Sequence, residues 1–576
     1  MPSPLSELDR LVSDAIRTTF RQTSGQVDAA LRPSKFADAQ ANAALALAKS
    51  IGQSPRETGS QLQATLTNAN IERIAAVELS GPGFLNFTFR TDWLADQFTT
   101  LESDPRLGVP AEDVKIIPID YSAPNVAKEM HVGHLRTTVV GDSLARILEA
   151  LGHRVIRQNH IGDWGTPFGM LIEHLIDAGA ESAEARLLES DPNAFYQASR
   201  SKFDSDPSFA ERSRTRVVKL QAYEPESLRI WQTLVERSKQ YFNEIYARLN
   251  ISLTDADLAG ESTYNDDLAA VCDELEASGI ARVSNGALCV FLDGYNGRDG
   301  EPSPLIIRKS DGGYGYATTD LATVRKRVRQ LEADYLLYVV GATQALHLQM
   351  VWETARLAGW LPERVQVEHV QIGSVLGPDH KILRTRSGES VRLRTLLDEA
   401  VARVAENLED RPELPAHERE QISEKVGIGA VKYADLSVAH DTDYVFDAQR
   451  MTATTGNTGP YLQYAATRIR SILRNAEGES VQRAAFAITN DSERALVLSL
   501  LGFGSVVAEA GTDAKPHLLC AHLFTVAQDF SRFYETSPIL NAEGELRSSR
   551  IRLAEVTLAV ITRGLDLLGI EVPTRM

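Results

Sequence analysis

Residues 114–136 read VKIIPIDYSAPNVAKEMHVGHLR, and this stretch decides the fold class. The isoleucine-rich run at 114–120 predicts a buried strand, and a loop follows it. A helix is predicted from about His134 to Leu151, because Gly152 is a natural stop and a second strand resumes at Val155. The order strand, loop, helix, strand indicates a parallel α/β unit of the Rossmann type.

The residues before this unit predict a small α+β domain over residues 1–110. Apolar side chains recur at helical spacing between residues 5 and 16, and FLNFTF at 84–89 alternates like a strand. Pro105 and Pro110 then punctuate a polar link. We therefore expect the parallel-sheet domain to begin near residue 111.

The residues after the unit predict an interrupted sheet and then a helix bundle. Residues 175–255 are polar and helical in pattern, so we expect a helical insertion over about 175–300. The alternating pattern resumes with a helix from Thr318, a strand from Asp334, a helix from Ala345 and a strand from Val365, up to about residue 395. Strand signals almost disappear over 396–576, where apolar stripes such as Leu519, Leu523, Val526, Phe530 and Phe533 predict an all-α bundle. The fold class is α/β multidomain.

Composition restricts the kind of partner. The 576 residues carry 78 acids against 60 bases, a net charge of −18, which is the wrong sign for coating nucleic acid indiscriminately. Any RNA contact must be local, and two basic patches are candidates. We interpret the first as a solvated helix face. The patches are Arg325, Lys326, Arg327 and Arg329, and Arg468, Arg470 and Arg474.

The sequence shows no targeting, membrane or zinc signal. The amino-terminus reads as an amphipathic helix, and no window reaches the roughly 18 apolar residues that a membrane span needs. We therefore expect a cytoplasmic protein with no membrane partner. Cys272, Cys289 and Cys520 are far apart, which predicts small buried residues rather than disulfides or a zinc site.

The HVGH segment at 131–134 is the main candidate for chemistry. His131 and His134 lie three residues apart where a helix begins, and Gly133 leaves space for a ligand. Helix amino-termini attract anions, so this geometry suits a triphosphate. Two histidines without a third ligand make a weak metal site. The alternative is a pair of hydrogen-bonded, partly buried histidines.

The wider stretch SAPNVAKEMHVGHLR at 122–136 resembles the first signature of class I aminoacyl-tRNA synthetases, and its S-x-P-N opening resembles the arginyl members. Further segments resemble the same family in the expected order. They are GPGFLNFTF at 81–89, NHIGDWGTPFG at 159–169, GYGYATTDLA at 313–322 and NTGPYLQYAATRIRSI at 457–472. The resemblance implies ATP-dependent ligation of L-arginine to its tRNA through an arginyl-adenylate, with Mg²⁺ accompanying the nucleotide and no zinc.

The resemblance also implies which residues handle ATP. His131, Gly133 and His134 would contact the phosphates. The family's second signature, a loop with two lysines, corresponds here to HKILRTRSGESVRL at 380–393. Lys381 stands at the first lysine position and Arg384 replaces the second, so we expect Lys128 to share the role. For Arg386, this role and a simple surface ion pair are equally good interpretations.

The arginine pocket is implied in the same way. Tyr316 and Asp320 match the Y-x-x-x-D pair that grips the arginine side chain, although an aspartate in a first helical turn is also a common cap. Asp120 would be a second acid on the guanidinium. Asn125 and Gln344 would bind the amino-acid head, and Glu261 is a weaker candidate.

RNA contacts are implied at both ends of the chain. Phe84 and Asn86 would meet the tRNA elbow, although Phe84 could equally be a core residue. Tyr461, Gln463, Arg468 and Arg470 would belong to the anticodon-binding bundle. We expect a monomer. There are two rival interpretations, another class I synthetase and a non-catalytic tRNA-binding paralogue. Only the exchange of lysine for Arg384 favours the paralogue.

Overall fold

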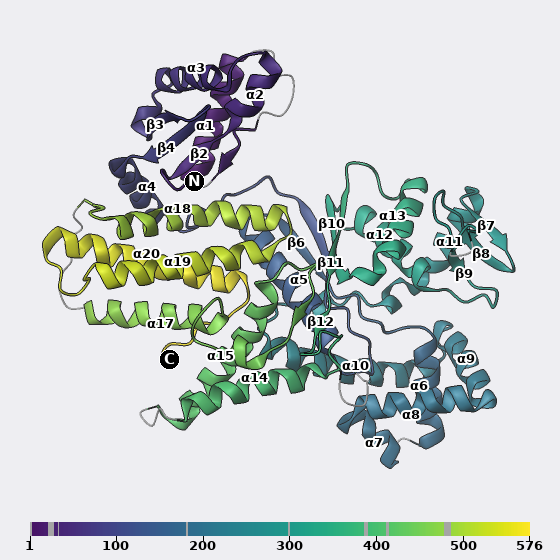
Figure 1. Ribbon diagram of the computed structural model, residues 1–576. Helices are drawn as coiled ribbons and strands as arrows, with labels where there is room; N and C mark the ends of the chain where they lie inside the picture. The colour runs from purple at the N-terminus through teal and green to yellow at the C-terminus, as the bar shows by residue number, and fades with distance from the viewer. Residues whose placement is uncertain are drawn as a thin grey trace.

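The computed structural model describes residues 3–20, 28–32, 34–179, 182–297, 300–384, 390–409, 414–476 and 485–576. A small amino-terminal domain sits above a helix bundle, and the central sheet lies between that bundle and two lobes formed by the middle of the chain (Figure 1). The multidomain α/β architecture that the sequence predicts is confirmed.

The amino-terminal domain is an antiparallel sheet of order β1-β2-β4-β3 covered by helices. The predicted helix at 5–16 and the predicted strand at 84–89 are confirmed. In β4, Leu85, Phe87 and Phe89 enter the core because alternate side chains of a strand share a face. The elements are α1 (Pro4–Thr19), β1 (Leu31–Arg32), β2 (Ala39–Ala41), α2 (Ala43–Ile51), α3 (Pro55–Asn68), η1 (Ile71–Arg73), β3 (Ala75–Ser80), β4 (Phe84–Phe89) and α4 (Thr91–Ser103).

The central sheet is parallel, with the order β11-β10-β5-β6. The chain passes from β5 through helix α5 to β6 on one side, and β10 later joins β5 on the other side. The carboxyl ends of β5 and β10 therefore flank a topological switch point, where such sheets bind ligands. The elements are β5 (Ile116–Asp120), α5 (Val132–Ala150), β6 (Arg154–Gln158), α12 (Tyr316–Arg329), β10 (Tyr335–Gly341), η4 (Ala342–Gln344), α13 (Ala345–Leu357) and β11 (Gln366–Ile372).

The insertion contains the expected helices and a small sheet that was not expected. The antiparallel strands β7, β8 and β9 form this sheet, and Asn285 and Gly286 turn the first pair with φ of 50° and 79°. Asn-Gly is the commonest sequence for such a turn. The elements are α6 (Thr166–Ala178), α7 (Ala183–Ser190), α8 (Pro192–Ser205), α9 (Pro207–Gln221), α10 (Pro225–Arg248), η2 (Asp255–Asp257), η3 (Glu261–Asp267), α11 (Leu268–Ala277), β7 (Ala281–Ser284), β8 (Ala287–Val290) and β9 (Leu305–Arg308).

The last part of the chain is a helix bundle, as predicted, and the apolar stripe of α19 is buried. The three cysteines are buried and unpaired, also as predicted. The elements are β12 (Val375–Leu376), α14 (Leu393–Leu408), α15 (Ala416–Leu436), β13 (Tyr444–Val445), α16 (Ala448–Met451), α17 (Gly459–Ala476), α18 (Asp491–Thr512), α19 (Pro516–Thr536) and α20 (Gly544–Leu567).

Helix α18 corrects one prediction. By length and composition alone it is apolar enough to cross a membrane, contrary to the expectation that no window would be. Half of its apolar window is buried inside the structure. Leu496, Val497 and Leu500 are fully buried there, and the helix packs on α4, α5 and α19. The apolar run therefore serves as a core helix in this fold.

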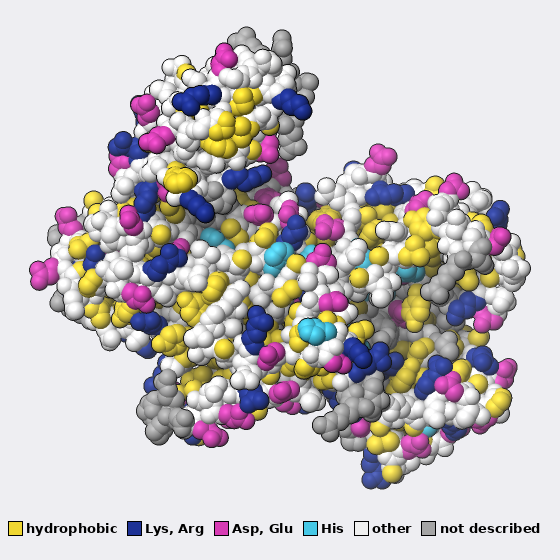
Figure 2. Space-filling model, viewed as in Figure 1, with side chains coloured by type: hydrophobic (Ala, Val, Ile, Leu, Met, Phe, Trp, Pro, Cys, Tyr) yellow, Lys and Arg dark blue, Asp and Glu magenta, His cyan; other side chains and the backbone are white. Residues whose placement is uncertain are grey.

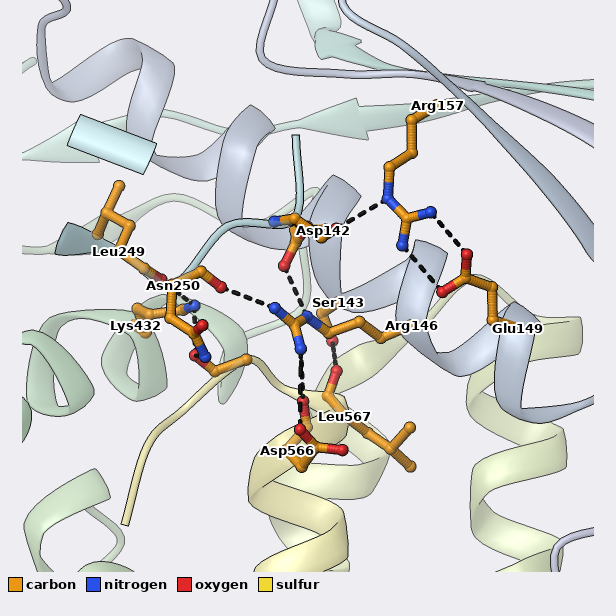
Figure 3. Close-up of polar contacts among 12 residues, drawn as sticks. Asp142, Ser143, Arg146, Glu149, Arg157, Leu249, Asn250, Lys432, Asp566 and Leu567 are labelled. Carbon is orange, nitrogen blue, oxygen red and sulfur yellow. Dashed lines mark hydrogen bonds and ion pairs between the residues drawn. The ribbon is translucent and has the colours of Figure 1, made fainter. Parts of the chain in front are cut away.

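Helix α5, which carries the HVGH segment at its start, is fastened to the bundle by a buried polar network (Figure 3). Arg146 donates hydrogen bonds to Asp142 (2.8 Å) and to the backbone oxygen of Asn250 (2.8 Å). Ser143 donates to the backbone oxygen of Leu567 (3.2 Å). Lys432 of α15 donates to the backbone oxygens of Leu249 (2.5 Å) and Gly569 (2.6 Å). The turn after α20 therefore completes the surroundings of α5.

Candidate active site

The two histidines of the HVGH segment cap helix α5 in a reciprocal pair. His131 precedes the helix, and its Nδ1 accepts a hydrogen bond from the Gly133 backbone N–H (3.0 Å). The Nδ1 of His134 in turn accepts from the His131 N–H (3.1 Å), and the two ring centres are 4.0 Å apart. A Cβ on Gly133 would come within 2.8 Å of the His131 ring. Gly133 is therefore needed for the cap itself as well as for ligand access.

Both imidazoles are neutral near pH 7. Burial lowers the pKa of His134 to about 3, and burial followed by the Lys128 charge lowers the pKa of His131. Because each Nδ1 accepts a backbone hydrogen bond, the proton of each neutral ring belongs on Nε2. The segment thus offers two fixed N–H donors at the positive end of a helix dipole.

The loop between β5 and α5 has a strained backbone held by other segments. Ser122, Ala123 and Ala127 have φ of 70°, 47° and 60°, in the left-handed region that non-glycine residues seldom adopt. Tyr246 and Ser238 from α10 bond Ser122 and the Ala127 N–H, at 2.7 and 2.9 Å. The insertion helix α10 therefore shapes the loop that precedes the histidines.

The cationic candidates lie in two different settings. The Lys128 ammonium sits 3.9 Å from the ring centre of Tyr196 on α8, close enough to influence both histidines. Lys381 and Arg384 are exposed on a loop after β12, where they line a cavity of about 630 Å³. Another cavity, of about 1020 Å³, lies beside Glu129 and α10. Arg386 lies outside the described residues. No described contact brings Lys381 to the histidines.

Residues 391–393, which follow this loop, contact the backbone of the HVGH segment. The sequence did not reveal this contact. The Val132 N–H donates to the Val391 oxygen (2.9 Å), and the Leu393 N–H donates to the Met130 oxygen (2.9 Å). Arg392 pairs with Glu129 at 3.0 Å. The two signature segments are therefore neighbours in space, although about 250 residues separate them.

Acidic side chains gather beside α12. Glu261 is 9% exposed, and burial raises its pKa to about 8, with the carboxylates of Asp163 and Asp320 adding to the shift. Asp163 is held by Ser262, whose N–H and hydroxyl donate at 2.9 and 2.6 Å. A cluster of carboxyl groups favours a bound cation, because a cation keeps all of them ionised. Glu261, the weaker candidate from the sequence, is thus a main member of this cluster.

The other predicted arginine ligands lie around these acids. Tyr316 begins α12 one turn before Asp320, and its side chain is 71% exposed. Asn125 is exposed in the loop after β5 and pairs with Gly162, where a Cβ would meet the Asn125 side chain. Gln344 is exposed at the start of α13, after β10. These side chains come from the loops and helix starts around the carboxyl ends of β5, β6 and β10.

Asp120 already has a cationic partner within the chain. It is buried, and its Oδ2 accepts a hydrogen bond from Nη2 of Arg327 at 2.7 Å, whereas its Oδ1 has no partner among the described residues. One oxygen of its carboxylate therefore already holds a guanidinium of the chain itself. The same contact overturns the interpretation of residues 325–329 as a solvated face, because Arg327 is fully buried and Arg325 pairs with Glu274 (2.6 Å).

The amino-terminal RNA candidates differ in accessibility. Phe84 is half-buried on the face of β4 opposite Phe87 and Phe89, so it is not part of that core. Asn86 is 9% exposed, donates to Ser80 (2.7 Å) and accepts from Gln40 (2.8 Å). Its amide is therefore engaged by two side chains of the amino-terminal domain.

The bundle candidates differ in the same way. Arg468 is exposed, with its guanidinium 4.4 Å from the ring centre of Tyr534. Arg470 donates to the Pro573 oxygen (2.8 Å), and Tyr461 contacts Ser531. Gln463 is fully buried, and its amide donates to two backbone oxygens. On the visible face of the molecule, acidic and basic side chains are interspersed (Figure 2).

Among the described residues, no group of three or more His, Cys, Asp or Glu is placed to hold a metal ion.

Comparison with known families agrees with this geometry. Residues 98–448 match the family model for the catalytic domain of class I tRNA synthetases (R), and 6–89 match the arginyl tRNA synthetase N-terminal domain. Residues 462–576 match the DALR anticodon-binding domain. The parallel sheet presents a histidine-capped helix at its switch point. Together with these family matches, this arrangement identifies a class I aminoacyl-tRNA synthetase.

Comparison with individual relatives identifies the family within this class. The arginine–tRNA ligase of Thermobifida fusca is 59% identical, with 100% of both chains covered, and that of Frankia casuarinae is 47% identical over 100% of this chain and 99% of the relative. Arginyl-tRNA synthetase from Plasmodium falciparum has a TM-score of 0.85 at 26% identity, with both chains fully covered. That from Thermus thermophilus shares the fold, with a TM-score of 0.81 at 23% identity and 99% of each chain covered. The chain belongs to the arginyl-tRNA synthetase family.

Proposed function

We propose that this site joins L-arginine to its tRNA in two steps that consume ATP. In the first step, a carboxylate oxygen of arginine attacks the α-phosphorus of ATP, and pyrophosphate leaves. In the second, a hydroxyl of the terminal tRNA ribose attacks the arginyl carbonyl, and AMP leaves. The observation that carries the proposal is the pair of capped histidines at the sheet's switch point, together with the cluster of acids around Glu261 and Asp320.

In this proposal, His131 and His134 bind the ATP phosphates through their Nε2–H groups. Their Nδ1 atoms are occupied by backbone N–H groups, so both rings present donors without needing a positive charge. The amino-terminus of α5 adds its dipole. Positioning of this kind and stabilisation of phosphate charge supply most of the acceleration in such transfers.

The proposal gives Lys128, Lys381 and Arg384 to the departing pyrophosphate. Lys128 lies beside the histidines, and the exposed loop with Lys381 and Arg384 would close as charge develops. Arg384 keeps the positive charge of the usual second lysine and adds a planar fork. ATP is a substrate rather than a resident cofactor, and Mg²⁺ would enter with its phosphates.

The proposed arginine pocket uses Asp320 and Glu261 for the guanidinium, with Tyr316 covering it. Asn125 and Gln344 would bind the carboxylate and amino group. Glu261 takes the place that the sequence suggested for Asp120, because Asp120 is paired with Arg327. Uncharged analogues would leave desolvated carboxylates without a partner, so they would bind far more weakly.

The proposed tRNA surface has two parts. The outer face of β4 with Phe84 would stack against the tRNA elbow. On the bundle, Arg468 over the Tyr534 ring and the neighbouring Tyr461 and Arg470 would meet the anticodon. We propose a monomer that works in the cytoplasm, which sedimentation velocity and cell fractionation would test.

The decisive test is replacement of both histidines by alanine, His131→Ala and His134→Ala, in the full chain. We expect ATP–pyrophosphate exchange with arginine, measured with tRNA present, to fall by at least about 100-fold, because two aligned donors are lost. The circular dichroism spectrum should remain that of the parent. Retained exchange, or parent exchange with another amino acid in place of arginine, would overturn the assignment.

A further inference from the structure

His347 stands out because it contacts the acid that the proposed function assigns to the arginine side chain. It lies in the first turn of α13, and its Nε2 is 2.5 Å from Oδ2 of Asp320 on α12. The two side chains are 32% and 24% exposed, so the pair faces a region that solvent and a small ligand can reach.

The contact leaves the other half of the carboxylate unused. The imidazole donates to Oδ2, and within the described part of the chain no residue bonds Oδ1 of Asp320. Because α12 and α13 pack against each other, the ring and the carboxylate are held by two neighbouring helices. A guanidinium could therefore take Oδ1 while His347 keeps Oδ2.

Repulsion between neighbouring carboxylates explains why Asp320 needs this hydrogen bond. Asp320 lies close enough to Glu261 to help raise the pKa of that buried carboxyl. Like charges so near one another repel, so an untethered Asp320 would turn toward solvent. The hydrogen bond to Asp320 also raises the pKa of His347, which favours a charged ring beside the carboxylate.

We propose that His347 is the positioning residue of the arginine pocket, and that its hydrogen bond fixes Asp320 in the orientation that accepts the guanidinium. The inference rests on the proposed function, because it takes Asp320 as an arginine ligand. His347 itself does not touch the reacting atoms. Residues that orient a binding group in this way typically contribute a large share of its affinity.

The same contact would also allow His347 to compete with arginine for Asp320, and the two roles can be told apart. If His347 were only a substitute cation, occupying Asp320 until arginine displaces it, removing the ring would tighten arginine binding. If it orients Asp320, removing the ring weakens binding, and a glutamine whose Nε2–H can donate to the same oxygen restores much of it.

The experiment compares His347→Ala and His347→Gln in the full chain. We measure calorimetric Kd values for L-arginine, for ATP and for L-citrulline, the uncharged isostere, and KM and kcat for aminoacylation. For His347→Ala we expect the arginine Kd and KM to rise about 10- to 100-fold, the range seen when an orienting residue is lost. The ATP Kd and kcat should stay within about threefold of the parent, and discrimination against citrulline should narrow. His347→Gln should recover most of the arginine affinity.

The matched control is His153→Ala, which removes another histidine–carboxylate pair. His153 Nε2 lies 3.4 Å from Glu112, just before the amino-terminal end of β6, so its loss should leave all three Kd values unchanged. Unchanged or tighter arginine binding by His347→Ala, with Asp320→Asn still weakening it, overturns this inference alone. Unchanged arginine binding by Asp320→Asn overturns the proposed pocket as well.

Discussion

The raised pKa of Glu261 makes arginine binding dependent on pH. With a pKa of about 8, roughly nine-tenths of this carboxyl is protonated at pH 7 in the free protein. An arginine guanidinium in the pocket favours the ionised form and lowers that pKa. Glu261 must therefore release its proton when arginine binds, so binding weakens as pH falls below 8.

The size of the effect follows from the same value. If the bound pKa returns near the ordinary 4.5, the apparent Kd scales as one plus the ratio of protonated to ionised carboxyl, and it rises about 50-fold from pH 8 to pH 6. At pH 7, about 0.9 proton leaves per arginine bound.

The assay is calorimetric titration with L-arginine in phosphate and in Tris, whose different ionisation heats report the protons released. Glu261→Gln should remove this release and flatten the pH dependence. The hydrogen bond to Asp320 raises the pKa of His347, so the Glu261 contribution is taken as the difference between the parent and Glu261→Gln. An equal Kd at pH 6 and pH 8 in the parent, or an unchanged slope in the variant, would refute the reasoning.

Two further predictions concern the helix start and the first strand. Gly133→Ala should lower kcat for arginine activation about tenfold with little change in folding, because the new Cβ pushes the His131 ring from its cap. Single-turnover adenylate formation measures this rate, and a rate equal to that of the parent would contradict the prediction. Asp120→Asn should lower stability by about 3–5 kcal/mol, because it leaves the Arg327 charge buried and unpaired. Urea denaturation followed by tryptophan fluorescence measures the loss, and a selective rise in the arginine KM without it would restore Asp120 to the arginine pocket.

Local patterns in the sequence predicted the framework well, because strand alternation and helical spacing are local properties. The strand before Asp120, the helix after His131 and the buried stripe of α19 were all predicted from such spacing. The hairpin of β7 and β8 was missed although Asn285-Gly286 signals it clearly. The two strands are only four residues long each, so their alternation is a weaker signal than the long polar helices that precede them.

The site was harder to predict because partners distant in sequence decide which side chains are available. Asp120 and Arg327 are 207 residues apart, and no local pattern shows that they neutralise each other. Asn86 is likewise used by Gln40 across a sheet. His347 left only a faint signal, its position one turn after Gln344 at a helix start. The histidine segment was found because its two histidines lie three residues apart in one short stretch that resembles a known signature, and the structure adds that they cap one another.

The network that joins α5 to the turn after α20 has a consequence for how the chain is made. Ser143 and Leu567 are 424 residues apart, so at ordinary synthesis rates the helix waits roughly 20–85 s for its last partner to leave the ribosome. Until then Ser143 lacks its carbonyl partner, and Lys432 has the Leu249 oxygen but not the Gly569 oxygen. A chain released before residue 567 would therefore leave the polar network around α5 unfinished.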